Sequence, residues 1–387
     1  MKLILNPKED RRVKRGHCWI FSNEIKSVDI NAKPGDLVSV YSSDDRFIGC
    51  GLYNPNSLIS IRIVSNTNTE LDSNWFKNKI AEALKFRLDL FSIGNSFRLI
   101  HGDSDGVPGV IVDKYDKILS VQISSLGMEL RKEILFDELM KIEGIEGIVE
   151  RGDSNSRFLE GLPIVVGVVR GNVGIQIVSD GYINYLVDAL GGQKTGFYLD
   201  QRESRIVLRK FSNNKNVLDL FSNSGGFSLH SKQSGAIKVI AVESSESTCN
   251  EFKKNIELNN LKGLSIRCND VFSELNSIQN SNEKFDLVIA DPPPFAKSKK
   301  HESAARKKYV QLFISCMNVT IKNGVNFYST CSHNITRDTF FEMIREASFK
   351  AKREIVILEE RGASYDHPIL ASMPETSYLR SAILLIK

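Results

Sequence analysis

The residues with the clearest chemical potential lie in segment 216–227, which reads Asn-Val-Leu-Asp-Leu-Phe-Ser-Asn-Ser-Gly-Gly-Phe. The apolar residues around Asp219 predict a buried strand, Gly225 and Gly226 predict a tight turn, and Phe227 can start a helix. A strand, a glycine turn and a helix in this order present backbone N–H groups and a carboxylate at one sheet edge. Open α/β sheets bind nucleotide-like ligands at that edge, so the segment predicts such a site.

Three more apolar runs end in an acidic residue, and they follow in chain order. Segment 238–243 ends at Glu243, about 20 residues past the glycine turn, where an acid can accept hydrogen bonds from ribose hydroxyls. Segment 264–270 ends at Asp270, which could reach an adenine amino group. Segment 285–295 carries Asp-Pro-Pro-Pro-Phe, whose prolines end the strand and hold Asp291 in the crevice. Each alone is an ordinary strand end, but four in order favour a ligand site.

Cys331 is the candidate nucleophile. It lies in Tyr-Ser-Thr-Cys-Ser at the end of the strand that follows the one carrying Asp291, so both side chains should reach the same crevice. A free cysteine is usually a small packing residue, but the Asp-Pro-Pro partner favours a thiolate nucleophile here. Cys316 falls on the apolar face of a helix, and Cys18, Cys50, Cys249 and Cys268 are predicted to be structural.

The elements that must position these residues alternate between strand and helix from residue 216 onward. This alternation predicts an α/β fold with a Rossmann-like, doubly wound parallel sheet, and the late strand pair allows one antiparallel strand at its edge. Residues 1–70 read as short strands of a small β-barrel. Residues 71–180 read as an α+β middle domain, and the third predicted domain is 181–387.

Composition narrows the class of protein. The chain has 387 residues, is 41% hydrophobic and carries a net charge of +4. No run approaches the ~18 apolar residues of a membrane span, and the N-terminus has no signal-peptide pattern, so a cytoplasmic protein without a membrane partner is expected. The six cysteines form no CxxC pair, so neither a metal site nor a disulfide framework is predicted.

Basic residues gather in two places. One group lies at the N-terminus, and the other follows Asp-Pro-Pro; they are Lys8, Arg11, Arg12, Lys14 and Arg15, and Lys297, Lys299, Lys300, Arg306, Lys307 and Lys308. Most charge runs are solvated faces, but a basic stretch beside a predicted ligand site suits a polyanion such as RNA.

Nearly the whole chain resembles the class I S-adenosylmethionine-dependent RNA methyltransferases that carry an N-terminal PUA domain, and most closely their 23S ribosomal RNA cytosine-C5 branch. The resemblance rests on segments 16–22, 99–109, 194–202, 219–227, 291–295 and 328–332. It implies S-adenosylmethionine as the cofactor and RNA, either 23S ribosomal RNA or a large-subunit precursor, as the partner. The oligomeric state, including a homodimer, stays open.

The resemblance also implies roles for individual residues. Asp291 would face the target base and Cys331 would attack it, as the two catalytic residues. Glu243 would bind the ribose of the cofactor and Asp270 its adenine. The remaining residues implied to bind the cofactor, together with Asp291, are Asp219, Phe221, Ser222, Gly225, Gly226, Lys194, Tyr198 and Gln201.

The implied chemistry is reasonable because C5 of cytosine is a poor nucleophile and needs covalent activation. A thiolate that adds to C6 moves electron density to C5, and an acid at N3 takes up the developing charge. Two-cysteine cytosine methyltransferases place a second cysteine after Asp-Pro-Pro, where this chain has Pro294. The base that removes the C5 proton is therefore not identified by the sequence.

Three other functions remain open at this point. Related Asp-Pro-Pro-x-Phe enzymes methylate guanine nitrogens and need no nucleophile, so a dispensable Cys331 would favour them. A non-catalytic, cofactor-binding ribosome assembly factor would not need Asp291 and Cys331 together. A dinucleotide oxidoreductase is disfavoured because the loop lacks G-x-G-x-x-G spacing. The target nucleotide is not given by the sequence.

Overall fold

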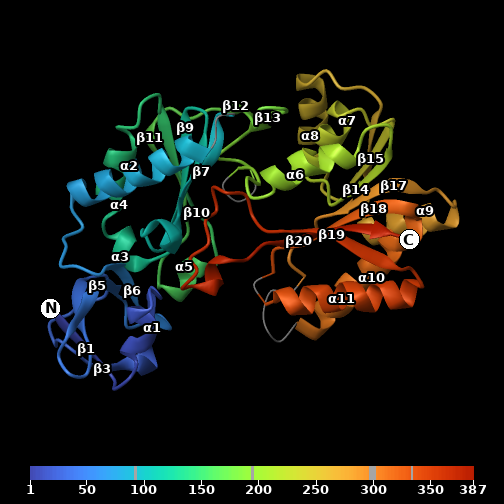
Figure 1. Cartoon of the computed structure of the whole chain (residues 1–387). Helices are drawn as coiled ribbons and strands as arrows, with labels where there is room; N and C mark the ends of the chain where they lie inside the picture. The colour runs from blue at the N-terminus through green and yellow to red at the C-terminus, as the bar shows by residue number, and fades with distance from the viewer. Residues whose placement is uncertain (91–93, 193–195, 296–301, 333) are drawn as a thin grey trace. The chain divides into compact units, whose positions relative to one another are not determined.

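The computed structural model describes the chain except residues 91–93, 193–195, 296–301 and 333 (Figure 1). By their internal contacts, the described residues form two compact units. Unit 1 comprises Met1–Asp180, Val187–Leu199 and Tyr365–Thr376, and unit 2 comprises Gly181–Leu186, Asp200–Ser364 and Ser377–Lys387. The predicted domains 1–70 and 71–180 therefore fall within one unit, although each has its own sheet.

The N-terminal part of unit 1 is a six-stranded sheet in the order β2-β6-β5-β4-β1-β3. The short strands expected within residues 1–70 are confirmed as β1 to β6. Alternate residues point into a small core that includes Leu3, Val38 and Ile61. The elements are β1 (Lys2–Leu5), α1 (Asp10–Lys14), β2 (Trp19–Phe21), β3 (Ile25–Val28), β4 (Leu37–Tyr41), β5 (Phe47–Tyr53) and β6 (Ile59–Ser65).

The second sheet of unit 1 has five strands in the order β11-β10-β9-β8-β7. Between β9 and β10 the chain forms two helices, α3 and α4, which are interrupted at Leu130 and Arg131. Arg131 donates from Nη1 to the carbonyl oxygens of Gly127 and Gly35, which ties this break to the N-terminal part. The elements are α2 (Ser73–Leu90), β7 (Ser96–His101), β8 (Val110–Tyr115), β9 (Ile118–Ile123), α3 (Leu126–Glu129), α4 (Lys132–Leu139), β10 (Gly147–Gly152), α5 (Ser156–Leu159) and β11 (Val165–Gly171).

Unit 2 is built on a seven-stranded sheet in the order β16-β15-β14-β17-β18-β20-β19. The strands from β16 to β18 are parallel, as the alternating pattern predicts. Two short strands precede this sheet in the chain, β12 (Gln176–Ser179) in unit 1 and β13 (Asn184–Val187), most of which lies in unit 2. The strands are β14 (Asn216–Leu220), β15 (Lys238–Glu243), β16 (Leu264–Cys268), β17 (Phe285–Ala290), β18 (Thr320–Thr330), β19 (Ile355–Arg361) and β20 (Arg380–Ile386).

Helices cover both faces of this sheet (Figure 1). Leu218 and Leu220 pack on the side of α9, α10 and α11, whereas Val217 packs with residues of α6 and α7. This alternation along β14 follows from the two-residue period of a strand buried on both faces. The helices are α6 (Arg202–Leu208), α7 (Gly226–Gln233), α8 (Glu246–Leu258), α9 (Val271–Asn280), α10 (Glu302–Val319) and α11 (Arg337–Ala351).

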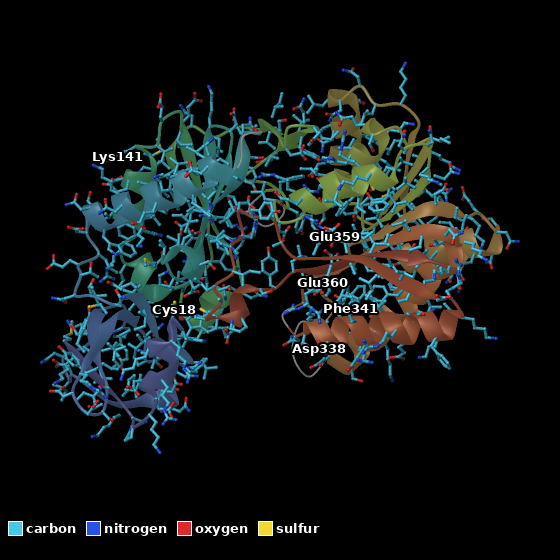
Figure 2. The ribbon with its side chains drawn as sticks, viewed as in Figure 1. Cys18, Lys141, Asp338, Phe341, Glu359 and Glu360 are labelled. Atoms are coloured by element: carbon cyan, nitrogen blue, oxygen red, sulfur yellow. The ribbon has the colours of Figure 1, made fainter. Side chains whose placement is uncertain are left out.

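The sequence pattern allows one antiparallel strand at the edge of the sheet, but the antiparallel strand is not the edge strand. β20 is antiparallel to both β18 and β19 and lies second from the edge, so β19 is the edge strand. Arg337 of α11 donates to both carboxylate oxygens of Glu360 on β19, at 2.6 Å each. Figure 2 shows the side chains of Asp338 and Phe341 on α11 and of Glu359 and Glu360 on β19. Charged side chains on an edge strand disfavour pairing with a further strand.

Candidate active site

The glycine turn at the carboxyl end of β14 has an unusual backbone. Phe221 and Asn223 have φ angles of 60° and 48°, in the left-handed region that bulky residues rarely adopt. Gly225 has φ of 95°, and a Cβ there would lie 2.0 Å from the Phe252 ring of α8. Gly225 is therefore required for the turn and for packing against α8. Strained residues of this kind concentrate at functional sites, where the surrounding structure fixes them.

Asp219 is fully buried beside this turn. Its Oδ2 accepts a hydrogen bond of 2.6 Å from the Ser228 hydroxyl of α7. Its Oδ1 has no hydrogen-bond partner among the described residues, and the same holds for the hydroxyl of Ser222. Burial raises the pKa of Asp219 to about 7, and the nearby Asp291 carboxylate adds to the rise, against the hydrogen bond from Ser228. An orphaned carboxylate oxygen in the interior is an acceptor that awaits a donor.

Asp291 follows β17 directly, as the Asp-Pro-Pro segment predicts. Its Oδ1 accepts hydrogen bonds from Gln201 Nε2, at 3.1 Å, and from the Ser329 hydroxyl of β18. Loss of hydration raises the pKa of Asp291 to about 6. The hydrogen bond from Ser329 lowers this pKa and the carboxylate of Asp200 raises it. Because both donors use Oδ1, a proton on this carboxyl group is best placed on Oδ2.

Glu243 ends β15 and Asp270 follows β16, and both carboxylates accept hydrogen bonds from backbone N–H groups. Glu243 Oε1 accepts from the backbone N–H groups of Ser244 and Ser245, and Oε2 accepts from that of Asn223 at 3.1 Å. The bonds hold the carboxylate against the glycine turn. Asp270 Oδ1 caps α9 by accepting from the backbone N–H of Ser273 at 2.9 Å. Each carboxylate oxygen has further lone pairs, so these bonds leave room for a ligand donor.

Cys331 lies one residue past the end of β18 and is half-buried. Because β17 and β18 are parallel and adjacent, its strand end neighbours that of Asp291. Thr330, directly before it, donates a hydrogen bond of 2.9 Å to the hydroxyl oxygen of Tyr309 on α10. Burial raises the pKa of Tyr309 to about 12, and the charge of Cys331 contributes to this rise. The nucleophile expected from the sequence is thus placed at the same sheet edge as the acid.

A cluster of aromatic rings lies next to Asp291. Phe295 lies 6.2 Å from the ring of Phe221, 6.3 Å from that of Phe272 and 4.7 Å from that of Tyr309. The ammonium group of Lys308 sits 4.4 Å from the Phe295 ring centre, within the range of a cation–π contact. A cluster of this kind offers an apolar wall beside the acidic strand ends.

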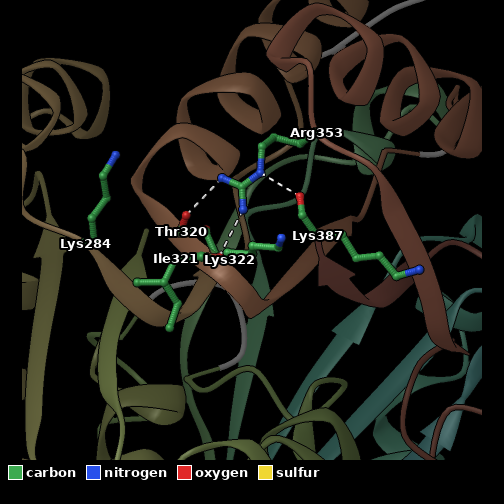
Figure 3. Close-up of a pocket in the computed structure, with 6 residues that line it drawn as sticks. All are labelled: Lys284, Thr320, Ile321, Lys322, Arg353 and Lys387. Carbon is green, nitrogen blue, oxygen red and sulfur yellow. Dashed lines mark hydrogen bonds between the residues drawn. The ribbon is translucent and has the colours of Figure 1, made fainter.

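A pocket of about 540 Å³ lies at the opposite, amino edge of the sheet (Figure 3). Arg353 donates to the carbonyl oxygens of Met317, Thr320, Ile321 and Lys387. These include carbonyls at the C-terminal end of α10, where a helix leaves acceptors unpaired and favours positive charge. None of the residues that line this pocket is acidic or a nucleophile; they are Lys284, Thr320, Ile321, Lys322, Arg353 and Lys387. We assign it a structural role.

The structure groups most of the residues expected from the sequence and leaves two aside. Nine of these residues lie on the carboxyl side of the unit 2 sheet, at strand ends, in turns or, for Gly226, at the start of α7. They are Asp219, Phe221, Ser222, Gly225, Gly226, Glu243, Asp270, Asp291 and Cys331. Lys194 is outside the described residues, and Tyr198 belongs to unit 1, so their roles stay predictions. Gln201 contacts Asp291, and a Cβ at Gly226 would approach the Arg205 side chain.

Sequence reasoning missed the residues that support this group. Ser329 and Ser228 donate to the carboxyl groups of Asp291 and Asp219, and Phe272 and Lys308 contact the Phe295 ring. Ser329 could have been found, because it stands two residues before Cys331 and a strand repeats its facing every two residues. The described residues hold no group of three or more His, Cys, Asp or Glu side chains arranged for a metal ion. None of the described helices is long and apolar enough to cross a membrane.

Comparison with solved structures supports the architecture. The chain superimposes on SMU.776, a protein assigned as a methyltransferase and solved with SAH, with a TM-score of 0.87, 21% identity and full coverage of both chains. It superimposes on a protein from Streptococcus mutans assigned as a SAM-dependent methyltransferase with a TM-score of 0.85, 20% identity and full coverage of both chains. At these identities the likeness establishes the fold: a PUA-like domain followed by a methyltransferase-like α/β domain.

Sequence comparison identifies the family. Residues 3–66 match the PUA-like domain, and residues 205–313 match Conserved hypothetical protein 95. The chain is 33% identical to the ribosomal RNA large subunit methyltransferase I of Shewanella frigidimarina, over 99% of this chain and 98% of that protein. It is 31% identical to the protein of the same name from Escherichia coli, over 98% of each. This identity over the full length shows that the chain belongs to the ribosomal RNA large subunit methyltransferase I family.

Proposed function

We propose that this protein transfers a methyl group from S-adenosylmethionine to C5 of a cytosine in 23S ribosomal RNA through a covalent adduct of Cys331. The observation that carries the proposal is the pairing of Cys331 with Asp291, a carboxyl group whose pKa is raised to about 6, at neighbouring strand ends. Membership of the ribosomal RNA methyltransferase family supports the substrate class.

The residues at the carboxyl edge fit the cofactor. Asp219 Oδ1 and the Ser222 hydroxyl are buried polar atoms without a partner among the described residues, as expected where a polar ligand supplies the missing hydrogen bonds. Asp219 would accept from the amino group of the methionine part, and Glu243 from the ribose hydroxyls. Asp270 would hold the adenine amino group, and the rings of Phe221, Phe272 and Phe295 offer an apolar surface for its face. Bound S-adenosylmethionine supplies an electrophilic methyl group.

Two residues of this chain then activate the cytosine. The thiolate of Cys331 adds to C6 and forms a carbon–sulfur bond, which shifts electron density to C5. Asp291 protonates or hydrogen-bonds N3 through Oδ2, because Oδ1 is occupied by Gln201 and Ser329. A carboxyl group with a pKa of about 6 remains partly protonated near neutral pH, as a general acid requires. After methylation a base removes the C5 proton and Cys331 leaves as the thiolate.

The nucleophile is tested with RNA that carries 5-fluorocytidine at the target. Elimination stalls because fluorine cannot leave as a proton, so a denaturant-resistant protein–RNA adduct should accumulate. Cys331→Ala should abolish both adduct and turnover while SAH binding, followed by calorimetry, stays unchanged. Cys18→Ala is the matched control, because Cys18 is also half-buried but lies in unit 1 (Figure 2). Substantial methylation by Cys331→Ala would replace this mechanism with nitrogen methylation of guanine.

The substrate is tested by incubating the protein with labelled S-adenosylmethionine and ribosomal RNA from a strain that lacks the enzyme. Mapping the labelled base identifies both the nucleotide and the atom. A label on 5-methylcytidine of 23S ribosomal RNA is the expected result, and a label on a guanine or on 16S ribosomal RNA contradicts the proposal.

RNA binding is proposed for the N-terminal basic cluster. Arg12 pairs with Glu24 and Lys14 pairs with Asp10, whereas Lys8, Arg11 and Arg15 are exposed. Near Asp-Pro-Pro, Arg306 pairs with Glu342 and Glu346, Lys308 contacts aromatic rings and Lys307 is exposed. Lys297, Lys299 and Lys300 lie outside the described residues. Replacing Lys8, Arg11 and Arg15 together by alanine should reduce the slope of log affinity against log salt by up to about 2, at ~0.7 for each lost phosphate contact. An unchanged slope would count against the cluster.

A further inference from the structure

Two free cysteines flank Glu243, the residue to which we assign the cofactor ribose. Cys268 is the last residue of β16 and pairs in register with Glu243 of β15. Cys249 lies in the first turns of α8, and its sulfur is 3.6 Å from the Glu243 carbonyl oxygen. The same carbonyl oxygen accepts a hydrogen bond of 3.0 Å from the backbone N–H of Asn269, the residue directly after Cys268. The end of β16 and the start of α8 therefore bring two sulfur atoms together beside one functional residue.

The two thiols differ in what can reach them. Cys268 is exposed, whereas Cys249 is 2% exposed. Burial, and then the interaction with Cys268, raise the pKa of Cys249 to about 12, so it is a poor first nucleophile. An external oxidant can thus meet Cys268 first, with Cys249 held in contact behind it. An exposed attacking thiol beside a buried resolving thiol is the arrangement of redox-sensing cysteine pairs in reducing compartments.

We propose that Cys249 and Cys268 form an oxidisable dithiol that closes to an intramolecular disulfide and weakens cofactor binding. With a small disulfide such as oxidised glutathione as the oxidant, the Cys268 thiolate attacks one of its sulfur atoms and releases one glutathione thiolate. Cys249 then loses its proton and attacks the Cys268 sulfur of the mixed disulfide, which releases the second glutathione. Two protein thiols are oxidised, and one external disulfide is reduced to two thiols.

The crosslink acts on the ligand site through the backbone. In the reduced form the Glu243 carbonyl oxygen accepts from the Cys249 thiol and, at 3.0 Å, from the backbone N–H of Asn269. Disulfide formation removes the thiol donor and draws α8 toward the end of β16. Asp270 stands two residues beyond Cys268, so the crosslink constrains both strand ends that carry the ribose and adenine acids. This part of the inference rests on the proposed cofactor assignment. We expect SAH to bind about tenfold more weakly to the oxidised form, a loss of about 1.4 kcal/mol.

The crosslink is tested on the full chain with oxidised glutathione at pH 8. Remaining thiols are alkylated under denaturing conditions, and the linked peptides are identified by mass spectrometry. A peptide pair joined through Cys249 and Cys268 is expected in the wild type and in Cys18→Ser. Cys268→Ser should form no such link, and this exposed residue can be replaced without loss of packing. Cys249→Ser should instead keep glutathione on Cys268. Glutathione that stays on Cys268 of the wild type without a crosslink would overturn the dithiol.

Calorimetry with SAH then tests the coupling on reduced, oxidised and dithiothreitol-treated protein. Weaker binding after oxidation that recovers on reduction supports the proposal, and unchanged affinity of a fully crosslinked sample overturns the effect on the ligand site. Failure of the reduced protein to bind SAH contradicts the proposed function instead. The two failures are distinguishable because peptide mapping detects the crosslink without any ligand.

Discussion

The two edges of the unit 2 sheet use charge in opposite ways. At the amino edge, Arg353 donates hydrogen bonds to four backbone carbonyl oxygens, and Figure 3 draws those of Thr320, Ile321 and Lys387. At the carboxyl edge, Asp219 is buried with one carboxylate oxygen that no described group satisfies, and Asp291 lies beside it. The first arrangement stabilises the fold, because a charged donor meets its acceptors. The second destabilises it, because burial penalises the ionised form.

The difference separates structural from functional charge in this molecule. A pocket lined by cations is the more conspicuous feature on the surface, yet its central cation, Arg353, has acceptors for its hydrogen bonds. The carboxyl edge combines raised carboxyl pKa values, left-handed backbone at Phe221 and orphaned polar atoms. Strain and incomplete hydrogen bonding together indicate where a ligand completes the structure.

The largest expected effect is on catalysis at the carboxyl edge. Asp291→Asn keeps an oxygen to accept from Gln201 and Ser329 but cannot act as an acid, so kcat should fall by about 10³-fold. Methyl transfer to ribosomal RNA measures kcat, and SAH calorimetry serves as the control for an intact site. A variant that retains more than a tenth of wild-type kcat would remove Asp291 from the proposed chemistry.

Gly225→Ala and Gly226→Ala test whether the turn itself is indispensable. At Gly225 the added Cβ is strained by the left-handed φ and collides with the Phe252 ring. The free energy of unfolding should therefore fall by about 3–5 kcal/mol. At Gly226 the neighbour is the end of the flexible Arg205 side chain, which can move, so a loss of about 1 kcal/mol is expected. Urea denaturation compares the two. Equal losses would show that packing against α8 is not what requires Gly225.

Asp219→Asn should stabilise the folded protein and lower its affinity for the ligand. The folded-state pKa of about 7 lies above the ordinary 3.8, so the wild type binds the extra proton when folded and loses stability as pH rises from about 4 to 7. The asparagine variant lacks this loss and should gain up to about 4 kcal/mol at pH 8, with little gain at pH 4. Urea midpoints across this range give the answer, and SAH calorimetry should show weaker binding. A variant less stable than the wild type at pH 8 would contradict the comparison.

The smallest effects on the reaction are expected at the amino edge. Arg353→Ala leaves four carbonyl oxygens without their donor and should lower the free energy of unfolding by about 3 kcal/mol, with kcat and SAH affinity unchanged below the unfolding transition. Lys322→Ala in the same pocket is the matched control and should change stability by less than about 0.5 kcal/mol. A loss of turnover in either variant would show that this edge also serves the reaction.

The local sequence pattern was sufficient to predict the strands of unit 2 and the acidic residues at their ends. Strands such as β14 and β17 are short apolar runs bounded by polar residues and turn signals, and these are properties of adjacent residues. The break between α3 and α4 depends on a long-range tie from Arg131 to Gly35, which adjacent residues do not reveal. The place of β20, second from the edge, follows from strand pairing that no local pattern encodes.

The sequence by itself determined which chemical groups stand at the carboxyl ends of the strands, because a residue's distance from a strand end is fixed along the chain. Only the tertiary structure decided what those groups contact. Gln201 and Ser329 reach Asp291 from 90 and 38 residues away and lower its pKa, whereas desolvation in the folded chain raises that pKa to about 6. The same holds for Gly225, whose need for glycine comes from a ring on α8, and for Cys249 and Cys268, which the sequence predicted as separate structural residues. Hydrogen bonding and desolvation depend on neighbours in space, which the folded chain alone supplies.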